Sequence, residues 1–226
     1  MRFPSIAFML SLLLVSGCSG DLSVLEPAGP ASHKVALLWW VMFGGACAIF
    51  VLVAVLLALV FFRPAMMARI NSRQWLIGGG IAFPLPVLMA LVAFSFMQGE
   101  SLLPQSASDP LRIGAVSRMW NWEFVYQTPT GTVSSTDVLH LPVDRDVVLE
   151  VKSADVIHSF WVPRLGGKID AVPGISNRIV LRADQTGAFG GICSEYCGTG
   201  HAGMSFRVVA YDESDFSRVI GELGQN

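Results

Sequence analysis

Charged residues are scarce in this chain of 226 residues. Only 14% of its residues are charged and 53% are hydrophobic, whereas a soluble globular domain has about 25% charged residues. This composition argues against a cytosolic globule, and it also argues against a disordered chain, which needs low hydrophobicity and high net charge. Basic residues are not in excess, because the formal net charge is −2. A nucleic-acid-binding function is therefore not expected.

Cysteine is also rare, and this excludes two further classes of protein. Four cysteines in the whole chain are too few for a disulfide scaffold. No Cys-x-x-Cys-His motif is present, so the chain does not carry a covalently attached c-type haem.

The chain begins with features of an export signal. Residues 1–17 contain Arg2, an apolar run and small residues before Cys18, which is the layout of a secretory signal peptide. The ending Val-Ser-Gly-Cys resembles a bacterial lipoprotein box, and this resemblance implies that Cys18 is lipidated. The alternative is an uncleaved signal anchor. Residues 18–34 contain glycine and proline and are expected to form a linker.

Two long uncharged stretches predict transmembrane helices within residues 35–97. Val35–Phe62 has no charged residue in 28 positions, and a helix of about 42 Å exceeds the roughly 30 Å hydrocarbon core. Trp75–Met97 is the second stretch and includes three glycines and two prolines, which a membrane helix tolerates. The intervening loop, residues 63–73, holds three arginines and no acidic residue. It is therefore expected in the cytoplasm, which places both ends of the chain in the periplasm or outside the cell.

Residues 98–226 have the pattern of an all-β domain with a net charge of −5. Trp120, Trp122, Phe124 and Tyr126 alternate with polar residues, as expected for a half-buried strand. The sequence predicts strands separated by turn residues, and these strands cover Met119–Gln127, Val147–Lys152, Ile157–Val162, Arg178–Leu181 and Ser205–Tyr211. Ser214–Leu223 is predicted as a helix with Ser214 or Asp215 as N-cap. Several short strands favour a sandwich or a barrel.

The metal-ligating residues gather in one segment, Cys193–Met204, with the sequence CSEYCGTGHAGM. Two thiols, an imidazole and a thioether occur within these 12 residues, and soft sulfur ligands with imidazole select copper, zinc or iron–sulfur centres. The thioether favours copper, because methionine is a weak axial ligand in blue-copper sites. The glycines of the segment predict a loop rather than a helix.

A second histidine has to come from another part of the chain. His158 on a predicted strand is the best candidate, whereas His33 and His140 are expected to be ordinary surface residues. Two thiolates can bridge two metal ions, each of which then needs one imidazole. The ligand count therefore indicates a dinuclear copper centre rather than a mononuclear one.

Together with the preceding DVIHSFWVP segment around His158, the CSEYCGTGHAGM segment resembles subunit II of cytochrome c oxidase. The resemblance covers nearly all of the chain from Val35 onward. It implies a transmembrane hairpin of two helices followed by an all-β cupredoxin-like Greek-key barrel that carries a dinuclear CuA centre. The implied partners are subunit I and other subunits of a haem-copper oxidase, a c-type cytochrome as electron donor, and the bacterial plasma membrane.

The resemblance also assigns roles to individual residues. Cys193 and Cys197 bridge the coppers, and His158 and His201 are terminal ligands. The remaining implied residues are Met204 as weak axial ligand, the Glu195 backbone carbonyl as the opposing ligand, the Glu195 carboxylate at a magnesium site shared with subunit I, and Trp120 as the point where electrons enter from cytochrome c.

Two features depart from the family pattern. The second helix lacks the usual glutamate near its tryptophan and proline, which leaves a proton path through this subunit in doubt. Residues 127–131 are neutral, whereas many members of the family have acidic residues there that help to dock basic cytochrome c. Either docking of the cytochrome depends less on charge here, or the electron donor is a different one. Two other functions remain open: the copper subunit of a nitric oxide reductase, and a membrane-anchored copper chaperone.

Overall fold

The computed structural model describes residues 19–99, 110–129 and 131–224. Within these ranges, residues 19–36 form one compact unit with the residues from 110 onward, and residues 37–99 form a second unit. The predicted signal peptide and the lipidation of Cys18 lie outside the described residues. The signal and its lipid therefore stay predictions.

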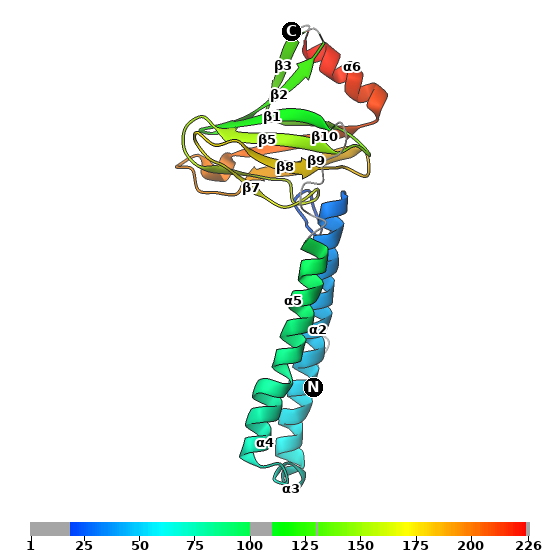
Figure 1. Cartoon of the computed structure of the whole chain (residues 1–226), viewed down its shortest axis with the longest axis vertical. Helices are drawn as coiled ribbons and strands as arrows, with labels where there is room; N and C mark the ends of the chain where they lie inside the picture. Colours follow the sequence, from blue (N-terminus) through cyan, green and yellow to red (C-terminus); the bar gives the residue numbers. More distant parts are fainter. Residues whose placement is uncertain (1–18, 100–109, 130, 225–226) are drawn as a thin grey trace, which may run out of the picture. The chain divides into compact units, whose positions relative to one another are not determined.

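Two segments are long and apolar enough to cross a membrane, Pro30–Phe62 and Ser72–Gly99. Apart from residues 30–36, both belong to the unit of residues 37–99, which we call the helical unit. Neither has buried residues within its most apolar window, so the described chain does not cover their apolar surfaces. Both segments agree with a membrane anchor. Figure 1 shows them as the blue-to-cyan and green helices, and their elements are α2 (Pro30–Phe62), α3 (Pro64–Met67), α4 (Ser72–Ile77), η2 (Gly78–Ala82) and α5 (Pro84–Gly99).

The glycines and prolines of the second segment change its helical geometry locally. Gly78–Ala82 forms a π-helical turn, in which the Phe83 amide donates to the Gly78 carbonyl at 2.9 Å. Pro84 then begins α5, because proline lacks the N–H that a continuous helix would require there. At the other end, Asn71 and Gln74 form a capping box that starts α4.

The unit formed by residues 19–36 and the residues from 110 onward, which we call the β unit, is built on two five-stranded sheets (Figure 1). The pairs β1–β5 and β4–β10 are parallel, and the other paired strands are antiparallel. The first sheet has the order β3 (Gly131–Thr136), β2 (Asn121–Thr128), β1 (Leu111–Arg118), β5 (Val147–Ser153) and β8 (Asn177–Leu181). The second has the order β4 (Val138–Pro142), β10 (Ser205–Tyr211), β9 (Gly187–Cys193), β6 (His158–Trp161) and β7 (Ile169–Ala171).

Aromatic side chains join the two sheets in a common core. Trp122 and Phe124 on β2 are fully buried, and their rings lie 5.7 Å and 5.5 Å from that of Phe206 on β10. Phe160 on β6 stacks on Phe206 at 4.9 Å. The expected fold class, two apolar helices followed by a cupredoxin-like β domain, is confirmed.

Two local predictions were wrong. Trp120 does not continue the alternation of Trp122, Phe124 and Tyr126, because β2 begins only at Asn121 and the Trp120 side chain is 41% exposed. The C-terminal helix α6 (Glu213–Leu223) has Asp212 as its N-cap rather than Ser214 or Asp215.

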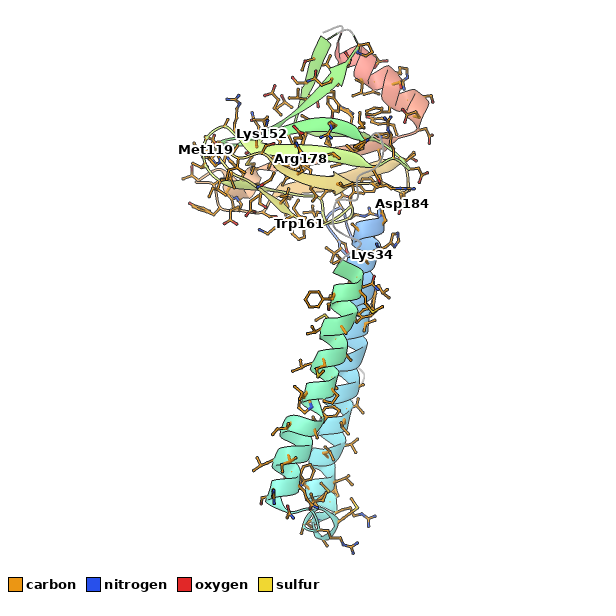
Figure 2. The ribbon with its side chains drawn as sticks, viewed as in Figure 1. Lys34, Met119, Lys152, Trp161, Arg178 and Asp184 are labelled. Atoms are coloured by element: carbon orange, nitrogen blue, oxygen red, sulfur yellow. The ribbon has the colours of Figure 1, made fainter. Side chains whose placement is uncertain are left out.

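The segment that the sequence suggests as a linker is docked on the β unit. We call residues 19–36 the N-terminal strap. The Ala28 amide donates to the Arg164 carbonyl at 2.7 Å, and the Asp184 amide donates to the Ala28 carbonyl at 2.9 Å. Helix α2 begins within the strap, five residues before Val35, since proline is favourable in a first helical turn. Figure 2 shows Asp184 beside the start of this helix.

Candidate metal centre

Neighbouring ends of three strands position the candidate ligands. His158 begins β6, Cys193 ends β9, and Met204 directly precedes β10. The Cys193 amide donates to the Met204 carbonyl at 3.0 Å, which closes the loop between β9 and β10. A short 3-10 helix, His201–Gly203, completes this loop. We call residues 194–203 the metal loop.

The donor atoms of the predicted ligands lie close together. The Cys193 sulfur is 3.8 Å from His158 Nδ1 and 3.9 Å from the Cys197 sulfur. The Cys197 sulfur is 3.5 Å from His201 Nδ1 and 3.7 Å from the Met204 sulfur. The arrangement is therefore a pair of sulfurs with an imidazole on each side.

The interior of this site is protected from water. His158, Cys193, Cys197 and Met204 are buried, and His201 is half-buried. Both cysteines are free, and their sulfurs are too far apart for a disulfide, whose S–S bond is about 2.05 Å. Burial, followed by the neighbouring Cys193, raises the pKa of the Cys197 thiol to about 11. A bound cation would favour the thiolate form of both sulfurs.

Comparison with known proteins identifies a family for this chain. Residues 116–211 match the family model of the cytochrome c oxidase subunit II periplasmic domain, and the matched range contains the two cysteines, His158, His201 and Met204. The chain belongs to the cytochrome c oxidase subunit II family. Its matched domain is described as periplasmic, which agrees with an outer-side location for the β unit.

Members of this family differ in the donor that their names state. The chain is 31% identical to a cytochrome c oxidase subunit 2 of Alkalihalophilus pseudofirmus over 95% of its own length, and it spans 66% of that relative. It is 28% identical to a cytochrome bo(3) ubiquinol oxidase subunit 2 of Pseudomonas putida over its full length, spanning 75% of that relative. The solved periplasmic domain of subunit II from Bradyrhizobium japonicum matches with a TM-score of 0.49 and 29% identity, covering 54% of this chain and 97% of that one.

Sequence reasoning missed Asp155 as a residue of this site. Its carboxylate accepts a hydrogen bond from His158 Nε2 at 2.8 Å. Because a carboxylate only accepts, Nε2 carries the proton and Nδ1 is left free toward Cys193. The only sequence signal is the position of an acidic residue three places before His158.

The Asp155 carboxylate also receives two backbone hydrogen bonds. The amides of Met119 and Val156 both donate to it at 2.7 Å. Burial acts to raise the pKa of Asp155, but the hydrogen bonds from His158 and these amides outweigh it and lower that pKa. Asp155 is therefore held as a carboxylate that connects a candidate ligand to the turn before Trp120.

Trp120 lies directly on the metal loop. Its Nε1 donates a hydrogen bond to the Cys197 carbonyl at 3.1 Å. Trp122 instead lies in the core, where its ring is 6.4 Å from that of His158. The structure thus brings Trp120 and the five predicted ligand side chains into one connected group, while their roles stay predictions.

Glu195 contributes to the site through its backbone and turns its side chain elsewhere. Its carbonyl oxygen lies 3.3 Å from the Cys193 sulfur. Its carboxylate lies 3.9 Å from the Lys168 ammonium, which is also 3.6 Å from Asp170.

His140 is buried, which contradicts the expectation of a surface residue. Its Nδ1 lies 3.1 Å from the Tyr211 hydroxyl, and its amide donates to the Tyr126 hydroxyl at 2.8 Å. Burial lowers the pKa of His140, which favours the neutral ring. His33 lies in the first turn of α2 with an exposed side chain, as expected for a surface residue.

Proposed function

We propose that this chain is the electron-input subunit of a respiratory haem-copper oxidase and holds a dinuclear CuA centre. The observation that carries the proposal is the buried pair of free cysteine sulfurs flanked by two imidazoles and a thioether. A disulfide redox pair does not need His158, His201 and Met204 at these distances. Soft sulfur and imidazole donors together fit copper.

The residues present suit two copper ions. Cys193 and Cys197 would bridge them, with His158 and His201 as terminal ligands and Met204 and the Glu195 carbonyl as weak ligands. When bound, such a centre supplies a one-electron acceptor that takes an electron from a reduced donor and delivers it to a haem.

The protein contributes rigidity, dryness and orientation. The ends of β6, β9 and β10 fix the positions of the ligands, and the burial of both sulfurs excludes water from them. Asp155 fixes the ring of His158. A site held in this way undergoes little rearrangement when its charge changes, which favours electron transfer over bond-making chemistry.

The proposed partners follow from the family. Subunit I of a haem-copper oxidase would accept the electron and carry out oxygen reduction, and a c-type cytochrome would supply it. Quinol is the rival donor, because some relatives are named quinol oxidase subunits. The β unit would face the periplasm, with the arginine loop in the cytoplasm. For the Glu195 carboxylate to bind a magnesium ion, the Lys168 ammonium would have to move away from it, or subunit I would have to contribute to the site.

The test is oxygen consumption by the purified complex, with reduced c-type cytochrome or ubiquinol as donor. We expect cytochrome c to support turnover and Cys197→Ser to abolish it. Cys47→Ser is the matched control, because Cys47 is an exposed free cysteine on α2. The proposal would be overturned if ubiquinol supported turnover and cytochrome c did not, or if cytochrome c oxidation survived in Cys197→Ser. A single labile copper without turnover would indicate a chaperone, and nitric oxide reduction in place of oxygen consumption would indicate a reductase.

A further inference from the structure

The Trp120 indole rests on two glycines of the metal loop. A Cβ atom added to Gly200 would lie 2.4 Å from Trp120 Cδ2 and 2.7 Å from Cε3 and Cγ. A Cβ added to Gly198 would lie 3.4 Å from Cζ2. The indole therefore covers the backbone at Gly200 closely, while 41% of Trp120 remains exposed.

The two glycines are required for different reasons. Gly198 has a φ of +112°, a conformation that side chains rarely adopt, so its backbone favours glycine. Gly200 has a φ of −88° and a ψ of 1°, which other residues can adopt. The lack of a side chain at Gly200 is thus explained by the ring above it and not by its backbone.

The indole is held from two further directions. Its Nε1 donates to the carbonyl of Cys197, whose sulfur lies in the candidate metal site. The preceding residue, Met119, donates its amide to Asp155, which also binds His158. Figure 2 shows Met119 at one end of the β unit. A displaced ring would lose its contact with the Cys197 backbone.

We propose that Gly200 is a positioning residue that seats the Trp120 indole against the metal loop and so keeps the hydrogen bond from Nε1 to the Cys197 carbonyl. This contact connects the partly exposed Trp120 indole to Cys197, the residue that carries one of the proposed bridging sulfurs. The inference rests on the proposed function, in which the donor loses one electron and the copper site gains it, with no bond formed or broken.

The kinetic test compares two substitutions in the same loop of the assembled complex. Gly200→Ala should slow cytochrome c oxidation several-fold, because a Cβ at this position displaces the indole and removes its hydrogen bond to the Cys197 carbonyl. Gly203→Ala is the matched control, since a Cβ there meets nothing within 4 Å, and it should leave the rate nearly unchanged. Both variants should keep the copper content and the copper spectrum of the wild type.

A double variant separates positioning from general damage. If Gly200 acts only through Trp120, Gly200→Ala should slow the Trp120→Leu variant no further. Additive losses would show that Gly200 acts by another route and would overturn the proposal, as would equal rates for Gly200→Ala and Gly203→Ala.

A second readout does not depend on turnover. In the complex labelled with fluorotryptophan, the resonance that disappears in Trp120→Phe reports on this indole. Gly200→Ala should shift it, and Gly203→Ala should not. An unshifted resonance in Gly200→Ala would refute the positioning role of Gly200 even if the wild-type complex oxidises cytochrome c. A shifted resonance, together with a wild-type complex that cannot oxidise cytochrome c, would support that role while refuting the proposed function.

Discussion

Asp155 is the residue on which the orientation of His158 depends. One carboxylate accepts the His158 ring N–H and the Met119 amide, so the same group orients a candidate ligand and the turn before Trp120. Hydrogen bonds of this kind fix the tautomer and ring position of a ligating histidine. The loss of the carboxylate should therefore affect metal binding more than folding.

We predict that Asp155→Asn weakens copper binding by about 10- to 100-fold, the usual cost of losing such a partner. An amide has one acceptor oxygen and a donor group, so it cannot satisfy the ring N–H and both backbone amides together. Copper affinity is measured by competition with a chelator. The control is Asp215→Asn, which affects an exposed pair with Arg218 on α6. Equal copper affinities in the two variants would contradict this role.

Met204 allows the weak-ligand assignment to be tested separately from packing. It is buried, and leucine has a similar volume, so Met204→Leu should cost less than about 1.5 kcal/mol of stability. We expect the reduction potential and the absorption spectrum of the copper centre to change in Met204→Leu, because the axial ligand tunes the potential of copper–thiolate sites. A spectroelectrochemical titration measures both. Met119→Leu replaces an exposed methionine and should change neither, and an unchanged potential in Met204→Leu would exclude ligation by its sulfur.

At the scale of elements, the N-terminal strap supplies hydrogen bonds that the sheets leave open. Strand β6 pairs with β9 only at Ile192 and Cys193. Farther along β9, the Gly190 amide donates to the Asp21 carbonyl of the strap at 3.2 Å. Arg164 secures the strap, since its Nε donates to the Glu26 carbonyl at 2.6 Å while its guanidinium lies over the Phe189 ring.

We predict that Arg164→Ala releases the strap and lowers the free energy of unfolding of the β unit by about 1.5–3 kcal/mol, the range for a hydrogen bond to a charged group. Hydrogen exchange should accelerate at the Ala28 and Gly190 amides. Arg178→Ala is the control, because Arg178 is exposed and pairs only with Glu150 among the described residues. Unchanged exchange in Arg164→Ala would show that the strap does not depend on this side chain.

At the scale of the whole molecule, local signals in the sequence predicted much of the architecture. The two uncharged stretches and the buried alternation of Trp122, Phe124 and Tyr126 are local patterns, and the structure contains both. The segment Cys193–Met204 contains most of the predicted ligands, so only the distant His158 had to be inferred from chemistry.

Features that depend on distant partners were not visible in the sequence. Strand β9 contains three glycines, and Gly191 is required because the Phe206 ring occupies the place of its side chain. The strap has the composition of a linker, yet backbone hydrogen bonds to Arg164, Asp184 and Gly190 dock it. The burial of His140 likewise depends on tyrosines from two other strands.

The proposed dinuclear centre requires the sulfurs of Cys193 and Cys197 to bridge two copper ions. The most direct test measures copper per chain in the purified complex together with its paramagnetic resonance spectrum. We predict two coppers per chain and a hyperfine pattern from one unpaired electron shared by both nuclei. The pattern should be lost in Cys197→Ser and kept in Cys47→Ser. One copper per chain, or a spectrum from an isolated copper nucleus, would contradict it.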